Sequence, residues 1–307
     1  MNLELAKPVV SVIIPSLDRP DLLAQTVDHF LTKESVKNLQ LVVVDQSEPA
    51  NEQLRERQHI DPRLNYHHVD FRGLPHARNF GVRHADAEII VFSEDDVIPC
   101  SGYLQAFLDY FKQSSAVAAT GPVVNLNEDI RRIDDVPTEE RIRLQGGQSA
   151  AFNVDFSFDS RYATGGNAAF RKSAVLAVGG FDENFQGSAW GEDEEFSYRL
   201  RQNGRVIRYL PGAKVIHLKN ATGGCRALVS VAYIRSFCMN AIYLRSRVAS
   251  SRIRYLQEIW ALLRRFVFNK RGFDRTLPQR AWAAACGILA GFRLAGQPPK
   301  LPMRDRL

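Results

Sequence analysis

The sequence predicts an α/β protein with a mostly parallel central sheet, helices on its faces and a helical C-terminal extension. In the first third of the 307-residue chain, short apolar runs rich in β-branched residues alternate with segments of helical apolar spacing. Repeated strand–helix units of this kind imply parallel strands joined by right-handed crossovers. In the last quarter, by contrast, the apolar residues recur at helical spacing throughout. We therefore expect one α/β domain followed by helices.

The first third contains four expected strands and three expected helices. Apolar runs predict strands at residues 9–15, 39–45, 64–69 and 89–92. Continuous runs of this type are typical of strands buried on both faces. Helical spacing predicts a helix that starts at Asp18-Arg19-Pro20, a short helix at 54–60, and a helix at 74–84 with Pro75 in its first turn.

The middle of the chain has a weaker pattern. Residues 125–149 are polar and charged without a clear period, which predicts a mobile loop or lid. Residues 152–158 alternate between apolar and polar types, as in an edge strand. Helices are expected at 171–178 and 192–202, where Gly204 ends the second, and short strands are expected at 206–210 and 214–218.

The C-terminal quarter is helical and strongly basic. Apolar stripes predict helices at about residues 228–244, 253–268 and 279–294. Residues 225–307 contain 16 Lys and Arg against three acids, whereas residues 1–224 have a net charge of −7. Such a basic region attracts an anionic surface: lipid head groups, nucleic acid or a phosphorylated acceptor. We expect a domain boundary at residue 224, between an α/β domain over 1–224 and a basic helical region over 225–307.

The location of the protein follows from two absences in the sequence. Glu4 and Lys7 interrupt the N-terminus, so no secretory signal is expected. No apolar stretch reaches the roughly 18 residues of a transmembrane helix, and the best candidate, 281–294, contains Arg293. These features predict a cytoplasmic protein, with the basic helices as the candidate for peripheral contact with the inner face of the membrane.

Three of the expected strands end in residues suited to ligand binding. The first strand ends in Pro15-Ser16, the second in Asp45 and the fourth in the triplet Glu94-Asp95-Asp96. In an open parallel sheet, ligands bind beyond the carboxyl ends of the strands, where these side chains converge. Adjacent carboxylates repel one another unless a cation neutralises them, and Mg²⁺ or Mn²⁺ binds carboxylate and phosphate oxygens together. The triplet predicts a metal–diphosphate site, and a solvated acidic turn is the alternative.

A glycine and an arginine lie just before the fourth strand. Gly73 permits a close approach, and the helix that begins near Pro75 offers free N–H groups to an anion. Arg78, one turn further along, would then contact a phosphate or a base. Taken alone, this segment is better explained as an ordinary surface helix.

A second acidic cluster begins at the expected helix of residues 192–202. Acids in a first helical turn commonly complement the helix dipole. Here, however, Trp190 and Gly191 stand directly before Glu192 and Asp193, which suggests a shaped acceptor pocket with an aromatic platform. One carboxylate near such a pocket could take the proton of an acceptor hydroxyl.

His217 ends the last expected strand. A lone histidine is usually a packed or surface residue. This one precedes the flexible basic segment Thr222-Gly223-Gly224-Cys225-Arg226. A neutral imidazole at this position could complete the metal shell begun by the acidic triplet.

The order of the motifs resembles glycosyltransferase family 2, the inverting enzymes of the GT-A fold. The motifs are SVIIPSLDRP, LVVVDQS, GLPHARNFGV, IIVFSEDD, ATGGNAAFRK, GGFDE, WGEDEEFSYRL and VIH. The resemblance covers about residues 9–226 and implies a Rossmann-like sheet. It also implies a nucleotide-sugar half at about 1–124 and an acceptor half at about 150–224.

The resemblance implies a role for each donor-side residue. Pro15, Ser16 and Asp45 would line the nucleoside pocket, with Asp45 reading the base. Gly73 and Arg78 would flank the nucleotide. The donor would be a UDP-, GDP- or dTDP-sugar.

The acidic triplet matches the DxD position of the family. The resemblance implies Asp96 as the principal metal ligand and places Asp95 near the ribose. Glu94 stands where the pattern has Asp, so its longer side chain leaves the assignment of ligands among the three acids open. His217 would assist the metal, and the cofactor would be Mg²⁺ or Mn²⁺.

The catalytic residues also follow from the resemblance. Gly165-Gly166-Asn167 would lie under the donor sugar. Glu192-Asp193 matches the ED motif, in which Asp193 is the general base. Asp193 would deprotonate the acceptor hydroxyl for a direct displacement, while the metal, with Arg226 or His217, offsets charge on the departing diphosphate. One base without a second nucleophilic carboxylate fits inversion.

We therefore expect a metal-dependent inverting glycosyltransferase of polysaccharide biosynthesis, acting on a hydroxyl of a glycan or lipid-linked acceptor. A sugar-phosphate nucleotidyltransferase is the first alternative, but it normally has a glycine-rich loop after the first strand, and residues 16–20 contain no glycine. A non-enzymatic module that binds anionic surfaces is the second, and it leaves the acidic clusters unexplained. We expect no nucleic-acid partner.

Overall fold

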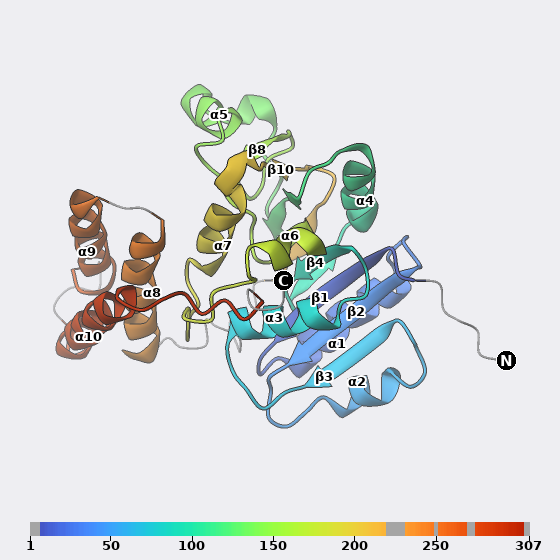
Figure 1. The fold of residues 1–307 in the computed structure, drawn as a ribbon, viewed down its shortest axis with the longest axis horizontal. Coiled ribbons are helices and arrows are strands. Elements are labelled where there is room, and N and C mark those ends of the chain that lie inside the picture. Colours follow the sequence, from blue (N-terminus) through green and yellow to red (C-terminus); the bar gives the residue numbers. More distant parts are fainter. Residues whose placement is uncertain (1–6, 219–230, 249–250, 269–273, 304–307) are drawn as a thin grey trace.

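Eight strands form the central sheet of the computed structural model, which describes residues 7–218, 231–248, 251–268 and 274–303 (Figure 1). Their order across the sheet is β3-β2-β1-β4-β9-β6-β10-β8. The strands are β1 (Val10–Ser16), β2 (Leu39–Asp45), β3 (Leu64–His68), β4 (Ile89–Ser93), β6 (Ala118–Thr120), β8 (Phe158–Ser160), β9 (Asn167–Arg171) and β10 (Ile207–Tyr209). The first four are parallel, as the sequence predicts. β9 lies antiparallel between β4 and β6, and β8 is antiparallel at the edge, so the sheet is mixed.

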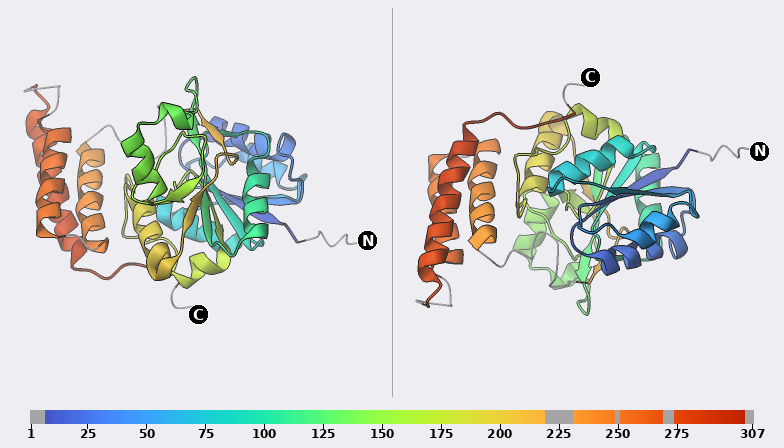
Figure 2. Two further views of the ribbon diagram at one scale, coloured as in Figure 1. Left: turned by 90° about the horizontal axis from the view of Figure 1, so that it is seen from above. Right: turned by 90° about the horizontal axis from the view of Figure 1, so that it is seen from below.

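Helices cover both faces of this sheet (Figures 1 and 2). They are α1 (Pro20–Thr32), α2 (Glu52–Arg57), α3 (Leu74–His84), α4 (Tyr103–Gln113), α6 (Lys172–Ala177) and α7 (Glu192–Arg201). Alternate residues of β1 enter different cores: Val12 and Ile14 pack with Phe30 of α1, whereas Ile13 packs with Val82 of α3. The continuous apolar runs are explained by this burial on both faces.

The structure corrects two predictions for the middle of the chain. Residues 125–149 are not a structureless loop, because they contain a 3₁₀ turn (Ile133–Asp135) and helix α5 (Thr138–Gln145). The edge strand predicted at 152–158 is also wrong: the strand there is β8, and only a single bridge joins Val154 to Arg131. Val136 and Leu144 anchor the segment by packing with Tyr209, and two apolar residues are too few to produce a periodic pattern.

The structure also contains helix α4, which the periodicity analysis did not predict. Its buried residues Tyr103, Leu104, Phe107 and Phe111 have helical spacing, so the sequence did contain the signal. Helix α2, predicted at 54–60, begins two residues earlier, because Asn51 caps it by accepting a hydrogen bond from the Leu54 N–H at 3.2 Å.

A second, three-stranded sheet brings His217 to the end of β4. It consists of β5 (Val97–Pro99), β11 (Val215–His217) and β7 (Val123–Asn125), in the order β5-β11-β7. The antiparallel register of β11 and β5 places His217 opposite Val97, next to the acidic triplet. On its other side His217 is opposite Asn125.

Three helices form the C-terminal region on one side of the α/β domain (Figure 2). They are α8 (Val231–Arg247), α9 (Arg252–Phe266) and α10 (Leu277–Ala295). These helices match the three predicted ones, except that residues 228–230 lie outside the described part of the chain. Among the described residues, no helix is both long and apolar enough to cross a membrane.

The chain after α10 runs back to the α/β domain (Figure 1). The Lys300 N–H donates to Asp182 at 2.9 Å, and the Lys300 ammonium pairs with Glu183 at 2.9 Å. Met303 is buried in the core formed by α3 and α7. The helical region is therefore fastened to the α/β domain by the segment that follows it.

The packing of α10 on α8 depends on a glycine. A Cβ added at Gly291 would lie 2.7 Å from the Met239 carbonyl oxygen and 2.7 Å from Ile242 Cβ. We predict that Gly291→Ala lowers the free energy of unfolding by about 1–3 kcal/mol, because α10 must move away from α8. Gly296→Ala is the control, because its nearest neighbour would be the Arg293 oxygen at 3.5 Å. Urea denaturation compares the two variants, and equal stabilities would contradict the close contact.

Candidate active site

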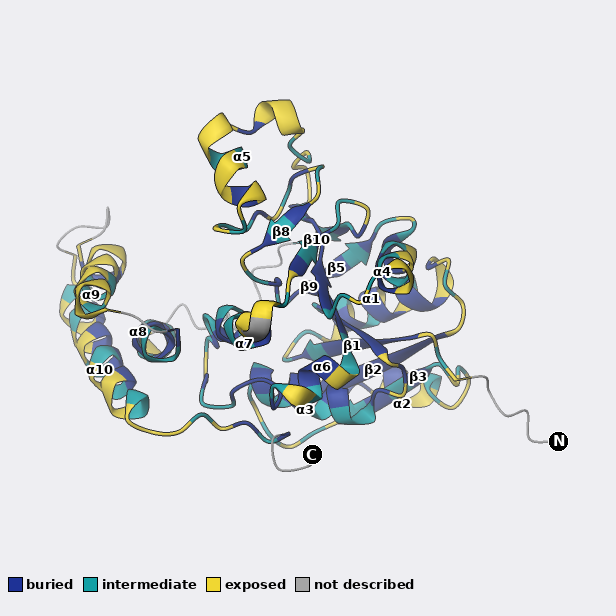
Figure 3. Cartoon of the chain, turned by 45° about the horizontal axis from the view of Figure 1, so that its top comes forward, coloured by how far each residue is buried: buried dark blue, intermediate teal, exposed yellow. Residues whose placement is uncertain are grey.

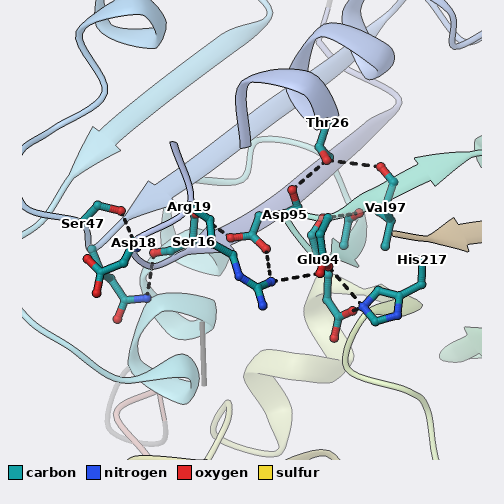
Figure 4. Close-up of polar contacts among 12 residues, drawn as sticks. Ser16, Asp18, Arg19, Thr26, Ser47, Glu94, Asp95, Val97 and His217 are labelled. Carbon is teal, nitrogen blue, oxygen red and sulfur yellow. Dashed lines mark hydrogen bonds and ion pairs between the residues drawn. The ribbon is translucent and has the colours of Figure 1, made fainter. Parts of the chain in front are cut away.

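The acidic triplet lies at the carboxyl end of β4, where it meets the end of β1. Ser16 Oγ donates a 2.6 Å hydrogen bond to Asp95 Oδ2 (Figure 4). Burial raises the pKa of the Asp95 carboxyl to about 6, although the hydrogen bond from Ser16 and the charge of Arg19 act in the opposite direction. The predicted convergence of strand ends is therefore present, since Ser16 is also opposite Asp45 in the β1–β2 register.

Arg19 is a site residue that sequence reasoning missed. Its Nη1 atom lies 3.0 Å from Asp95 Oδ1 and 3.0 Å from Asp96 Oδ2 (Figure 4). The sequence was interpreted only as a helix start at this position. The available signal was a single basic residue between the first strand and the first helix, in a chain with acids after the fourth strand. The guanidinium offsets part of the repulsion between the two aspartates.

Glu94, Asp96 and His217 form a candidate metal site. One ligand atom from each lies within 4.8 Å of the others. His217 Nε2 is 3.4 Å from Glu94 Oε2 and 3.3 Å from Asp96 Oδ1. Asp96 is buried, whereas the Glu94 side chain is 42% exposed. Two carboxylates and an imidazole suit a divalent cation such as Mn²⁺ or Mg²⁺, so this donor set fits the cofactor that the sequence implies.

Asp45, which the sequence predicts in the nucleoside pocket, lies at the end of β2 in a network of hydrogen bonds. Its Oδ2 accepts a 2.7 Å hydrogen bond from the Tyr66 hydroxyl, and its Oδ1 accepts one from the Ser47 N–H at 3.0 Å. The adjacent Gln46 accepts a 2.7 Å hydrogen bond from the Gly73 N–H through its side-chain oxygen. Gly73 has a φ of +147°, a conformation that favours glycine. These bonds fix the loop before α3 beside the end of β2. Pro15, also predicted in this pocket, is the partly buried residue before Ser16.

Asp193 lies in the first turn of α7, as predicted. Its Oδ1 accepts a 2.8 Å hydrogen bond from the Glu194 N–H, and its Oδ2 lies 3.4 Å from the Gly165 N–H. Gly191 precedes the helix with a φ of +87°. Burial raises the pKa of the Asp193 carboxyl above its usual value, against the effect of the nearby Arg78 charge.

Arg78 lies beneath this turn, and not at the surface. Its Nη1 atom donates to Glu192 Oε1, and its Nη2 atom donates to the Gly165 carbonyl oxygen at 2.8 Å. Both side chains of the ion pair are almost completely buried. The charges of Asp193 and Glu94 also act on the Arg78 guanidinium, so Arg78 stands between the two acidic clusters.

Gly165 and Gly166 are where the two acidic clusters meet. A Cβ at Gly166 would lie 2.6 Å from Glu94 Cδ, and a Cβ at Gly165 would overlap the Arg78 guanidinium. Glu94 therefore packs against one glycine while Asp193 faces the N–H of the preceding one. The carboxylates of residues 94 and 193, far apart in the sequence, occupy neighbouring positions in one site.

Two predicted residues, Asn167 and Trp190, have contacts other than those expected. The Asn167 side chain donates to the carbonyl oxygens of Pro122 at 2.9 Å and Ala213 at 2.8 Å, so both of its N–H groups are engaged away from the site. The Trp190 ring packs on the Phe237 ring of α8, with centroids 4.6 Å apart. Arg226 lies outside the described residues.

A cavity of about 590 Å³ lies between the α/β domain and the C-terminal helices, beside Glu194, the residue that follows the candidate base in the sequence. Tyr162 and Glu194 line it on one side, and Arg245, Arg254 and Gln257 line it on the other. Burial, together with the charges of Asp193 and Glu194, raises the pKa of the Tyr162 hydroxyl to about 12. This cavity could not be predicted from the sequence, because its walls come from segments that meet only in the fold.

Comparisons with known proteins identify related families. The model of "Glycosyl transferase family 2" matches residues 11–179, and that of "N-terminal domain of galactosyltransferase" matches residues 147–221. The pre-mycofactocin glycosyltransferase of Mycobacterium tuberculosis is 29% identical over 213 residues, which cover 68% of this chain and 42% of that protein. The chondroitin synthase of Escherichia coli is 24% identical over 240 residues, covering 68% and 34%. The chain thus spans less than half the length of either relative.

Two solved structures are similar in fold. GalNAc-T7 with UDP, GalNAc and Mn²⁺ has a TM-score of 0.58 at 18% identity, covering 86% of this chain and 55% of that one. The mannosyltransferase PcManGT of Pyrobaculum calidifontis, with GDP-Man and Mn²⁺, has a TM-score of 0.55 at 18% identity, covering 98% and 79%. At this identity the similarity concerns the fold alone.

The buried Arg78–Glu192 pair leads to a stability prediction. Arg78→Leu leaves the Glu192 carboxylate buried without its partner, so the free energy of unfolding should fall by about 3–5 kcal/mol. The double variant with Glu192→Leu should recover most of this loss, since a buried pair can be replaced by apolar residues. Arg57→Ala, which breaks an exposed pair with Asp28, is the control and should change stability by less than about 1 kcal/mol. Chemical denaturation measures all three variants. A loss of less than about 1 kcal/mol in the free energy of unfolding of Arg78→Leu would contradict the proposed burial of the charge.

Proposed function

The chain belongs to glycosyl transferase family 2 and is a glycosyltransferase with the GT-A fold, and on this premise we propose a specific reaction. The enzyme transfers a sugar from a nucleotide-diphosphate sugar to a hydroxyl of a glycan or lipid-linked acceptor. Transfer is metal-dependent and inverts the anomeric carbon. The observation that carries this proposal is that Glu94 and Asp193 flank the same pair of glycines, Gly165 and Gly166.

Asp193 is the proposed general base. It accepts the proton of the acceptor hydroxyl, and the oxygen forms a bond to the anomeric carbon. The bond from that carbon to the diphosphate oxygen breaks, and its electron pair leaves with the nucleoside diphosphate. The neighbouring Glu192 is engaged by Arg78, so it keeps Arg78 and Gly165 in place and is not itself a nucleophile. A displacement by one base, from the face opposite the leaving group, inverts the carbon.

The donor lies across the carboxyl ends of β1, β2 and β4. Asp45 is suited to a base edge, since the Tyr66 hydroxyl fixes the orientation of its carboxylate. Asp95, held by Ser16 and Arg19, is suited to the ribose. A divalent cation held by Asp96, Glu94 and His217 would offset the charge that develops on the diphosphate.

Two further observations support the donor class. Both solved structures were obtained with a nucleotide or nucleotide-sugar and Mn²⁺, which supports UDP- or GDP-linked donors and a divalent metal here. We also propose that the functional division follows the sequence, with a donor half at about 1–124 and an acceptor half at about 150–224. In the basic helical region of residues 225–307, helices α8 and α9 then form the outer wall of the acceptor side.

The acceptor enters through the cavity beside Tyr162. Its polar and charged walls suit the hydroxyls of a sugar, and Glu194 at its edge is adjacent to the base in the sequence. Gly191 allows α7 to pack close to Leu244 of α8, and the Trp190 ring packs on Phe237 of the same helix. The chondroitin synthase among the relatives supports a glycan acceptor and a role in polysaccharide biosynthesis.

The metal site can be tested without knowing the acceptor. Asp96→Asn removes one of two negative charges from the ligand set, so the dissociation constant for Mn²⁺ in the presence of UDP or GDP should rise by about tenfold or more. The exposed Asp70→Asn is the control and should bind like the wild type. Isothermal titration calorimetry provides the measurement. Unchanged Mn²⁺ affinity in Asp96→Asn would show that the ion does not bind at this site.

Asp193→Asn tests the base. Transfer should fall by about 10²–10⁴-fold while nucleotide binding is retained, because the amide cannot accept the proton. Asp70→Asn, an exposed carboxylate outside the site, is the control and should keep the wild-type transfer rate. In the wild type, kcat/KM should decline as the pH falls through a pKa above the usual 3.8 of aspartate, since burial raises that pKa and the protonated acid is inactive.

The readout is nucleoside diphosphate released from a panel of UDP-, GDP- and dTDP-sugars. Normal turnover by Asp193→Asn would disprove the assignment. Release of pyrophosphate in place of nucleoside diphosphate would instead indicate a nucleotidyltransferase.

A further inference from the structure

The outer sides of α9 and α10 expose large apolar side chains. Trp260 of α9 is 57% exposed and Trp282 of α10 is 72% exposed. We call the whole set the outer stripe. It consists of Ile253, Leu256 and Trp260 on α9 and of Trp282, Leu289 and Phe292 on α10. Side chains of this size are normally buried or used for binding when they gather on one region of a surface.

The spacing of these residues gives each helix one exposed apolar line. On α9 they recur at i, i+3 and i+7, and on α10 at i, i+7 and i+10, so each set lies along one side of its helix. The inward side is different: Leu262 and Phe266 of α9 and Ala284 of α10 form the core of the helical region. Figure 3 shows exposed segments along α9 and α10, on the part of the molecule farthest from the central sheet.

The charges beside the outer stripe are positive. Arg252 and Arg264 of α9 and Arg293 of α10 are exposed. The sequence of α10 contains no acid, and the only acid of α9 is Glu258. Glu258 points inward, where it pairs with Arg245 Nε at 2.8 Å and lines the cavity beside Glu194. The outer face is therefore apolar, aromatic and cationic.

We propose that the outer stripe docks on an anionic lipid bilayer. The tryptophans would lie at the level of the head groups, the aliphatic residues would enter the edge of the acyl region, and the arginines would bind lipid phosphates. This combination of an apolar aromatic line with flanking arginine is what an interfacial helix requires. A bilayer, and not an acidic protein, is favoured because two neighbouring helices offer apolar lines with no carboxylate among them.

Docking in this way leaves the active site accessible. Each residue of the outer stripe on α9 is followed directly by a residue that lines the cavity, Arg254, Gln257 or Ala261, so the two sets lie about 100° apart around the helix. The outer stripe is on a different side of the same helix, so a bilayer would not fill the cavity. The proposal does not depend on the sugar-transfer reaction, because membrane binding and donor hydrolysis are measured separately.

The test is flotation of the full chain with vesicles of phosphatidylcholine alone or with 30% phosphatidylglycerol added. Wild-type protein should float with the anionic vesicles, and tryptophan emission should shift to shorter wavelength as Trp260 and Trp282 leave water. Trp260→Ser with Trp282→Ser should reduce the bound fraction by about tenfold or more. Arg252→Gln with Arg264→Gln should weaken binding chiefly to the anionic vesicles. Ile60→Ser is the matched control, because Ile60 is 83% exposed on the α/β domain.

Three results would overturn the proposal. The first is no flotation of the wild type at low ionic strength. The second is binding that persists in the double tryptophan variant without any emission shift in the wild type, which indicates adsorption by charge alone. The third is a dimer that light scattering detects in the wild type and that the two tryptophan substitutions dissociate. A second copy of the chain, and not a bilayer, would then cover the outer stripe. Circular dichroism of each variant checks that α9 and α10 remain folded.

Discussion

The absence of side chains at residues 165 and 166 is the constraint on which the geometry of the site depends. Arg78 can reach the Gly165 carbonyl oxygen and Glu192 only because nothing projects from Gly165, and Glu94 can pack against Gly166 for the same reason. The N–H of Gly165 faces Asp193. One short turn thus positions Glu94 of the candidate metal site, the candidate base Asp193, and Arg78, the buried cation between the two acidic clusters. Larger residues there would separate the two halves of the site, even if every strand kept its place.

The electrostatics of the site follow from this arrangement. Five carboxylates, of residues 94, 95, 96, 192 and 193, gather where burial raises the pKa of several of them. Arg19 offsets the charge at Asp95 and Asp96, and Arg78 offsets that at Glu192. His217 lies beside these acids because the register of β11 and β5 in the second sheet places it opposite Val97. This balance of charges suits the cation, the diphosphate and the acceptor hydroxyl of the proposed reaction.

The sequence predicted the parts of this protein whose signal is local. Strands such as β2 are continuous apolar runs because both of their faces are buried, and the acids after β4 stand out against that background. Glu94, Asp96 and His217 were predicted as a set, and the fold brings their ligand atoms together. Arg19, the Arg78–Glu192 pair and the cavity beside Tyr162 were not predicted, because each depends on contacts between distant segments. Helix α5 was missed because it buries too few apolar residues to show a period.

The central claim is that a cation and a proton acceptor lie on either side of one anomeric carbon. The most direct measurement is a crystal structure with Mn²⁺ and a nucleoside diphosphate, in which anomalous scattering locates the ion. We predict an anomalous peak within bonding distance of Asp96 and His217. The terminal phosphate should contact the ion, and no protein atoms should lie between this phosphate and the carboxylate of Asp193. A peak elsewhere in the fold, or a terminal phosphate shielded from Asp193 by protein atoms, would contradict the account.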